Sequence, residues 1–278
     1  MIICPACGTA FRFLYAKNGC GIQRCETCGL GRTDASGFDP TSYYTEDYFS
    51  GAHADGYQDY VGEESVLRRE FARTVAFIRR FRPGGRMIEL GCAYGFFLQE
   101  AKPYFHVAGI ELAADAAAHA RQNGLNVLDG VADEANMRQL GAADVIVLLD
   151  VIEHLPDPPA TLALCERHLN PGGIIVLTTG DFGSLYARLA GTGWRLMTPP
   201  QHLWFFTPES LKRLGGKLGL RLLAADHPWK IVPLSLILFQ LRRMLGWRTP
   251  GKATASHVGL PVNLFDAMRI VLQKPETK

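Results

Sequence analysis

Two Cys-x2-Cys pairs constrain the start of this chain more than any other feature. Cys4 and Cys7 form the first pair, and Cys25 and Cys28 form the second, with seventeen residues between the two pairs. Four thiolates supplied as two close pairs are the ligand set of a structural zinc site, which a folded hairpin assembles. We therefore predict a zinc ribbon over residues 1–32. Four unrelated buried cysteines are the alternative.

The remaining composition fits an ordinary enzyme. Its 278 residues are 47% hydrophobic and carry a net charge of +2, which leaves room for the ribbon and one domain of about 200 residues. Cys20, Cys92 and Cys165 do not pair by spacing, and no secretory signal precedes the ribbon. These features predict a reducing cytoplasmic location and no transmembrane segment.

Charge is unevenly distributed along the chain. Residues 33–64 contain eight acids and no Lys or Arg, with seven aromatics between Phe38 and Tyr60. We interpret residues 33–62 as an acidic, aromatic linker or lid, two roles that are compatible. The negative charge would repel phosphates, so nucleic acid is an unfavourable partner.

A basic stretch near the C-terminus shows the opposite pattern. Residues 227–265 contain five Lys or Arg and no acid, and we expect a basic, apolar insertion near 229–252. Its apolar run, 231–241, is too short to cross a bilayer, which takes about twenty residues. Helical spacing predicts a helix packed on the core or on a second subunit. A helix at a membrane surface, or one gripping the phosphate of a lipid- or nucleotide-linked sugar, stays open.

From residue 63 to 278 the chain alternates helices with short apolar strands, which predicts a layered α/β domain with a mostly parallel sheet. The continuous apolar strands indicate burial on both faces. Strands are expected at 86–90, 106–110, 125–128, 144–149, 174–178, 220–224 and 266–272. Helices are expected at 63–81, 113–123, 159–169 and 208–218, and another follows the turn 91–95 and ends at residue 101. A Pro-Gly-Gly turn is expected at 171–173.

The turn after the first of these strands predicts the ligand. It carries Gly91 and Gly95 in a G-x-x-x-G spacing, not the G-x-G-x-x-G of dinucleotide-binding folds. Ligands of such sheets bind beyond the carboxyl ends of the strands. Glu111, at the end of the second strand, can accept hydrogen bonds from both hydroxyls of a ribose. We therefore predict an adenosine-like ligand without a pyrophosphate, the alternative being an ordinary tight turn with an acid nearby.

Four segments, MIELGCAYGFFLQEA, HVAGIEL, DVIVLLDVIEHLPDP and LNPGGIIVLTT, resemble the successive motifs of class I S-adenosylmethionine-dependent methyltransferases. The resemblance covers roughly residues 63–275 and implies a Rossmann-like fold with a mostly parallel seven-stranded sheet and helices on both faces. It implies that Glu111 binds the ribose and Leu112 packs on the adenine. Asp150 would lie beside the donor methyl. Residues implied around the rest of the cofactor are Glu89, Gly91, Cys92, Ala93, Gly95, Ala132 and Asp133, with Ala93 standing where many members have a third glycine.

With the ribbon and the segments YYTEDYFSG and PPQHLWFFTPESL, the whole chain resembles a bacterial subgroup of zinc-ribbon methyltransferases. That resemblance implies methylation of a sugar, glycan or other small metabolite on oxygen or carbon. His154 and His202 are the candidate general bases, although either can be a packed or capping histidine. The alternatives are an RNA methyltransferase that binds its substrate through the ribbon, and a non-catalytic cofactor-binding scaffold.

A further resemblance concerns the segment after the fourth strand. Asp150, Glu153 and His154 are similar to the cluster that ubiquinone-pathway O-methyltransferases use near the acceptor, where a divalent cation can help. Such ligands suit manganese or zinc better than magnesium. We favour the simpler interpretation, in which Glu153 and His154 open the following helix.

Overall fold

A central seven-stranded sheet organises the computed structural model, which describes residues 2–34, 60–234, 238 and 258–276. Its strand order is β10-β13-β8-β7-β4-β5-β6, and β13 is antiparallel to both neighbours while the other pairs are parallel. The predicted fold class is confirmed. The strands are β4 (Arg86–Leu90), β5 (His106–Glu111), β6 (Asn126–Asp129), β7 (Ala143–Leu149), β8 (Leu169–Gly180), β10 (Arg221–Asp226) and β13 (Ala267–Gln273).

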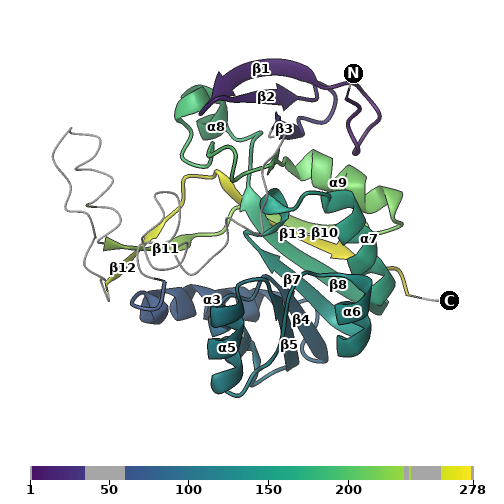
Figure 1. Ribbon diagram of the computed structural model, residues 1–278, viewed down its shortest axis with the longest axis vertical. Coiled ribbons are helices and arrows are strands. Elements are labelled where there is room, and N and C mark those ends of the chain that lie inside the picture. The colour runs from purple at the N-terminus through teal and green to yellow at the C-terminus, as the bar shows by residue number, and fades with distance from the viewer. Residues whose placement is uncertain (1, 35–59, 235–237, 239–257, 277–278) are drawn as a thin grey trace.

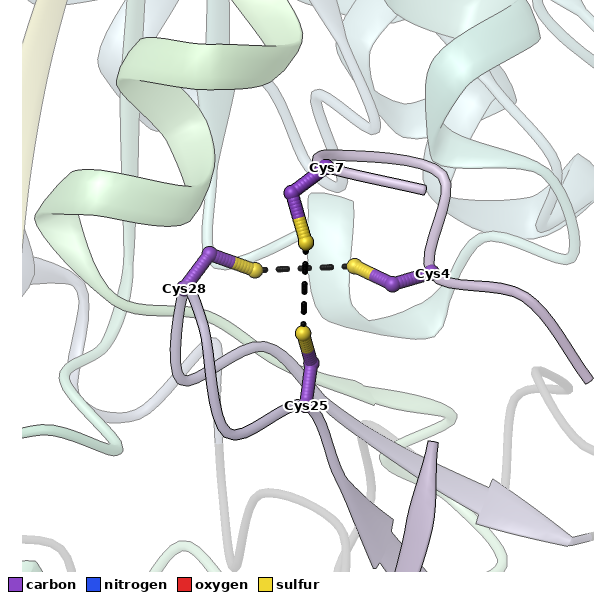
Figure 2. A group of neighbouring side chains, drawn as sticks. All are labelled: Cys4, Cys7, Cys25 and Cys28. Atoms are coloured by element: carbon purple, nitrogen blue, oxygen red, sulfur yellow. Dashed lines mark hydrogen bonds between the residues drawn. The ribbon is translucent and has the colours of Figure 1, made fainter. Parts of the chain in front are cut away.

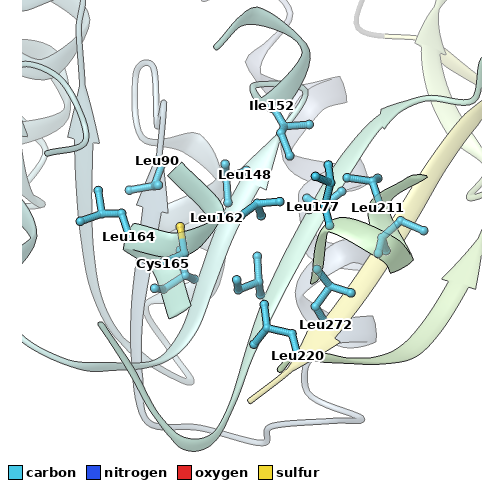
Figure 3. Packing of buried hydrophobic residues seen from close by; sticks show 14 of the residues in the cluster. Leu90, Leu148, Ile152, Leu162, Leu164, Cys165, Leu177, Leu211, Leu220 and Leu272 are labelled. Atoms are coloured by element: carbon cyan, nitrogen blue, oxygen red, sulfur yellow. The ribbon is translucent and has the colours of Figure 1, made fainter. Parts of the chain in front are cut away.

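Helices cover both faces of this sheet because its central strands are apolar on both sides. Along β7, Val145 and Val147 point into one core, whereas Ile146 and Leu148 point into the other. The first core contains α3 (Glu64–Ile78), α4 (Phe96–Ala101) and α5 (Ala114–Gln122). The second, shown in Figure 3, contains α6 (Glu134–Leu140), α7 (Pro158–His168) and α9 (Pro208–Lys217).

Two local features of the large domain, one in the sheet and one helix, differ from the sequence-based expectation. The Pro-Gly-Gly at 171–173 is not a turn before a strand; it lies inside β8. Pairing with β7 jumps from Ala143 opposite Leu169 to Val145 opposite Ile174, so the extra residues form a bulge in the ladder. The sequence analysis also missed α6, whose first turn is capped by the Asp133 side chain.

The N-terminal residues 2–34, here called the cysteine module, form β1 (Arg12–Lys17), β2 (Cys20–Arg24) and β3 (Gly31–Asp34). A fourth strand, β9 (Trp204–Phe205), pairs with β3, so the methyltransferase-like part completes the module's sheet. Figure 1 shows the module above the large sheet, beside α8 (Leu185–Ala190) and α9. The Lys17 ammonium donates to the Thr192 carbonyl oxygen, in the 3-10 turn Gly191–Gly193 that follows α8.

The C-terminal insertion begins as a strand. β11 (Lys230–Pro233) pairs with β12 (Gly259–Val262), and the hairpin contacts α3. Ile231 and Val232, at the start of the apolar run, are held in this ladder, whereas the helical spacing begins at Leu234 and lies mostly outside the described residues. Most of the proposed linker or lid and most of the remaining insertion lie outside the described residues. Within the described part, no helix has the length and apolarity needed to cross a membrane.

Candidate functional site

The four paired cysteines converge on one point. Their sulfur atoms all lie within 4.8 Å of one another, and Figure 2 shows them directed inward from two turns. Cys4 Sγ lies 3.5 Å from Cys28 Sγ, and Cys7 Sγ lies 3.3 Å from Cys25 Sγ. Four converging thiols on two separate turns fit a tetrahedral ion held by Zn–S bonds of about 2.3 Å. A metal bound there would link the two turns of the module.

This cysteine site is packed against the large domain. Cys4, Cys25 and Cys28 belong to the same buried cluster as Phe206 and Leu211. The capping residue of α9, Thr207, donates its hydroxyl to the Cys28 carbonyl oxygen at 2.7 Å. The module and α9 therefore share one core.

The G-x-x-x-G turn has the close packing that its glycines predict, because each glycine combines a positive φ with a neighbour that leaves no room for a side chain. Gly91 has φ +71°, and a Cβ there would lie 2.7 Å from a Val151 methyl group. Gly95 has φ +81°, and a Cβ there would lie 2.4 Å from Leu125. Ala93 also has a positive φ, +44°. A glycine is the residue that adopts this conformation without strain, which accounts for the glycine of many similar proteins.

Glu111 bridges the turn and the following helix. Its Oε2 accepts from the Ala93 amide at 2.7 Å and its Oε1 from the Ala113 amide at 2.8 Å. Burial raises the pKa of Glu111, and these amide hydrogen bonds oppose that effect. Each carboxylate oxygen has a second lone pair, so the side chain can still accept from a ribose.

Glu89 is the unsatisfied group of this region. It is 3% exposed, and its Oε2 is buried without a hydrogen-bond partner among the residues that the structure describes. Burial and the neighbouring Glu111 charge raise the pKa of Glu89 well above its ordinary value. An unpartnered buried carboxyl oxygen beside the turn fits a cationic group of a cofactor, such as an ammonium.

The other residues assigned to the cofactor take varied positions. The Cys92 thiol packs in the core against Gly109, where an added Cβ would lie 2.6 Å from the sulfur. Leu112 and Ala132 are partly buried. Asp133 caps α6, its carboxylate accepting from the Asn136 amide at 2.8 Å.

Asp150, at the tip of β7, has a partner that the sequence analysis did not identify. The Lys230 ammonium lies 3.1 Å from its Oδ2, and the Thr178 hydroxyl donates to its Oδ1 at 2.8 Å. Lys230 also pairs with Glu70 at 3.3 Å. Burial opposes both charges, but the mutual attraction outweighs it, lowering the pKa of Asp150 and raising that of Lys230. The signal for Lys230 was its position in an acid-free stretch.

The two candidate bases lie side by side. Their ring centroids are 4.7 Å apart, with His154 in the 3-10 turn η1 (Ile152–His154) and His202 in the segment before β9. His154 Nδ1 lies 3.0 Å from the Gln201 carbonyl oxygen, and His202 Nδ1 lies 2.7 Å from that of Leu196. A carbonyl only accepts, so both Nδ1 atoms carry the proton and both Nε2 atoms carry the lone pair.

Glu153 joins these histidines in one cluster. A carboxylate oxygen of Glu153 and one ring nitrogen from each histidine lie within 4.8 Å of one another. Burial raises the pKa of Glu153 to about 8, and burial lowers the pKa of His154 to about 4 and of His202 to about 3. One carboxyl and two neutral imidazoles can move a proton or hold zinc or manganese. His202 occupies the place that the sequence analysis gave to Asp150, which is directed to Lys230.

The cysteine module fixes the segment that carries His202. The Thr33 amide donates to the Leu203 carbonyl oxygen at 2.8 Å, and the Thr33 hydroxyl donates to that of His202 at 2.6 Å. The Leu203 amide in turn donates to the Glu153 carbonyl oxygen at 2.9 Å. Backbone hydrogen bonds therefore connect the module to both halves of the cluster.

Comparison with known proteins identifies a family. Residues 64–225 match a family model described as a methyltransferase domain. An enzyme named ubiquinone biosynthesis O-methyltransferase in Cereibacter sphaeroides is 30% identical over 177 residues, which cover 58% of this chain and 69% of that protein. The enzyme of the same name in Methylococcus capsulatus is 30% identical over 142 residues, covering 46% and 58%.

Solved structures agree in fold. A methyltransferase of Thermotoga maritima, described as S-adenosylmethionine-dependent, has a TM-score of 0.52 at 18% identity, covering 81% of this chain and 98% of that one. Magnesium protoporphyrin IX methyltransferase of Synechocystis, solved with bound S-adenosylhomocysteine, has a TM-score of 0.54 at 13% identity, covering 84% and 97%. At these identities the likeness shows the fold alone.

Proposed function

Because the chain belongs to the methyltransferase domain family and is an S-adenosylmethionine-dependent methyltransferase, we propose that it methylates a hydroxyl group of a small-molecule acceptor. The observation that carries this proposal is the pair of neutral imidazoles, His154 and His202, joined to the tip of β7 through η1. Methyl transfer from a sulfonium needs in-line positioning, and a hydroxyl acceptor additionally needs a base.

In this proposal the cofactor binds across the carboxyl ends of β4 and β5. Glu111 accepts from the ribose, and the orphaned Glu89 oxygen accepts from the cofactor's ammonium. The backbone of the Gly91–Gly95 turn lies against the methionine end, with Leu112, Ala132 and Asp133 on the adenine side. Asp150 lies beside the donor methyl group. Bound S-adenosylmethionine supplies the activated methyl group and its leaving group.

The bases act on the acceptor side. Burial keeps both imidazoles neutral near pH 7, and the carbonyl oxygens of Gln201 and Leu196 fix the Nδ1–H tautomer. One Nε2 then accepts the proton that the acceptor hydroxyl loses as the methyl group is transferred. Glu153 lies beside the pair, and the same three groups can bind a divalent cation.

We assign the cysteine module as a structural zinc ribbon of residues 1–32. The convergence of its four thiols and its shared core with α9 support this role. We keep residues 33–62 as a linker or lid, 63–278 as the catalytic domain and residues near 229–252 as its insertion. None of the seven cysteines, all of them among the described residues, forms a disulfide, which supports a cytoplasmic location.

For the acceptor, the proposal is a hydroxylated metabolite, with a sugar or glycan derivative as the first class to test. The relatives named ubiquinone biosynthesis O-methyltransferase support oxygen over carbon as the acceptor atom, and they make phenols the second class. Methyl-labelled S-adenosylmethionine would be incubated with the protein and panels of sugars, nucleotide-linked sugars and catechols. Labelled product from any panel supports the proposal. Failure of S-adenosylmethionine to bind in calorimetry, with NAD as the comparison, would contradict it.

A further inference from the structure

A cavity of about 590 Å³ opens between α3, the segment connecting β10 to β11, and β13. No residue of the Gly91–Gly95 turn lines this cavity, so it is separate from the proposed cofactor site. Its lining includes Thr178 and Lys230, which are the two side chains that hold Asp150. Two partners of Asp150 therefore form part of the cavity wall, which places the cavity next to the group proposed to lie beside the donor methyl.

The basic side chains that line this cavity differ in whether an acid pairs with them. Lys230 pairs with Asp150 and Glu70. Arg269 pairs with Asp226 through two hydrogen bonds, of 2.6 and 3.1 Å. His227 contacts Asp181 at 2.9 Å.

Arg73 differs from these basic side chains because no acid pairs with it in the described part of the chain. It is exposed on α3 and makes no ion pair or hydrogen bond with any part of the chain that the structure describes. A guanidinium free of acids at the edge of a cavity presents several N–H donors in a planar fork, a geometry that suits phosphate and carboxylate oxygens.

The cavity also has an aromatic wall. Trp229, directly before Lys230, lines it and is 58% exposed. Exposing a tryptophan to this extent leaves a large apolar surface in water, and such a surface is a common platform for a flat ring or a sugar face.

We propose that this cavity binds the acceptor through an anionic group, a phosphate or a carboxylate, held by Arg73, with the acceptor's ring packed on Trp229. This inference rests on the proposed methyltransferase function and narrows its substrate class to anionic, ring-containing acceptors. The bound anion would supply Arg73 with the negatively charged partner that no acid of the described chain provides. Lys230 would keep its ion pair with Asp150 when the acceptor is bound.

The test uses the full chain saturated with S-adenosylmethionine and three probes in calorimetry. Uridine monophosphate combines a ring with a phosphate, 4-hydroxybenzoate combines a ring with a carboxylate, and inorganic phosphate lacks a ring. At least one ring-containing probe is expected to bind. Binding of uridine monophosphate alone would identify a phosphate as the anion, and binding of 4-hydroxybenzoate alone would identify a carboxylate.

Two variants and one matched control locate the contacts. Arg73→Gln is expected to weaken the bound ring probe about tenfold, the loss of a charge-assisted hydrogen bond. Trp229→Ala is expected to weaken the ring probes more than inorganic phosphate. Arg69→Gln makes the same charge change one turn earlier on α3, at an exposed residue outside the cavity lining, and should leave probe binding unchanged.

Three results would overturn the inference: no binding of either ring probe, equal affinity in wild type and Arg73→Gln, or an equal loss in Arg69→Gln. S-adenosylmethionine affinity is measured in the same samples and should not change in any variant. Bound cofactor without bound probe would refute the anion site and leave the methyltransferase proposal intact. Absence of cofactor binding would instead refute the proposed function.

Discussion

The Lys230 ammonium lies 3.1 Å from the Asp150 carboxylate, although the two residues are 80 positions apart in the chain. One belongs to the insertion hairpin and the other to the tip of β7. Asp150 is held in a positive-φ conformation, with φ +54°. The pair therefore attaches the insertion to the part of the sheet where the proposed chemistry takes place.

We expect Lys230→Met to lower the free energy of unfolding by about 1 to 3 kcal/mol, because it leaves Asp150 and Glu70 without their cation in a partly buried site. Urea unfolding would measure the loss. Lys212→Met removes a charge from an exposed position of α9 and should change stability by less than about 0.5 kcal/mol. Lys230→Arg should recover part of the loss, and equal stability of Lys230→Met and wild type would show that the pair is not stabilising.

The cysteine site should control zinc content and also the acceptor side of the enzyme. Cys25→Ser is expected to lower the zinc content by one ion per chain, measured by mass spectrometry, because three thiolates and a hydroxyl make a weak zinc site. Turnover should fall as well, because Thr33 of the module holds the His202 segment. Cys20→Ser makes the same chemical change outside the cluster and should retain the metal. An unchanged zinc content in Cys25→Ser would contradict the four-cysteine site.

Glu89 predicts a pH dependence of cofactor binding. Its raised pKa means that the free protein holds a proton there at pH values where an ordinary Glu is ionised. A cationic cofactor prefers the ionised form, so binding should release a proton and the affinity should rise with pH up to about 7, below the pKa of an α-amino group. Calorimetry in buffers of different ionisation enthalpy measures the release directly. Glu89→Gln should abolish it, and no proton release in wild type would count against this contact.

For the histidine pair, the prediction concerns turnover without loss of cofactor binding. His154→Gln and His202→Gln should each slow methylation of the acceptor found in the labelled-methyl screen by about 10²- to 10⁴-fold, the range for general base catalysis. The double variant should be little worse than the poorer single variant if the rings act as a unit. His106→Gln, at an exposed residue at the start of β5, is the control. Full activity in both single variants would exclude a base role for either ring.

Local sequence patterns were sufficient for the strands of the seven-stranded sheet because each contains a short apolar run, and the central strands are buried on both faces. They failed at residues 171–173, since Pro-Gly-Gly has the same local preferences in a bulge as in a turn. They also missed α6, although Asp133 as a cap and the buried Met137 and Leu140 three residues apart were available signals.

By itself, the sequence determined the two cysteine pairs, the seven strands of the central sheet, and the glycine turn followed by Glu111, because each depends on residues close together in the chain. Only the tertiary structure decided that β9 completes the module's sheet, that His154 and His202 lie together, and that Lys230 pairs with Asp150. Those contacts join segments far apart in the chain. Their partners are selected by packing and charge compensation in three dimensions, which no local pattern records.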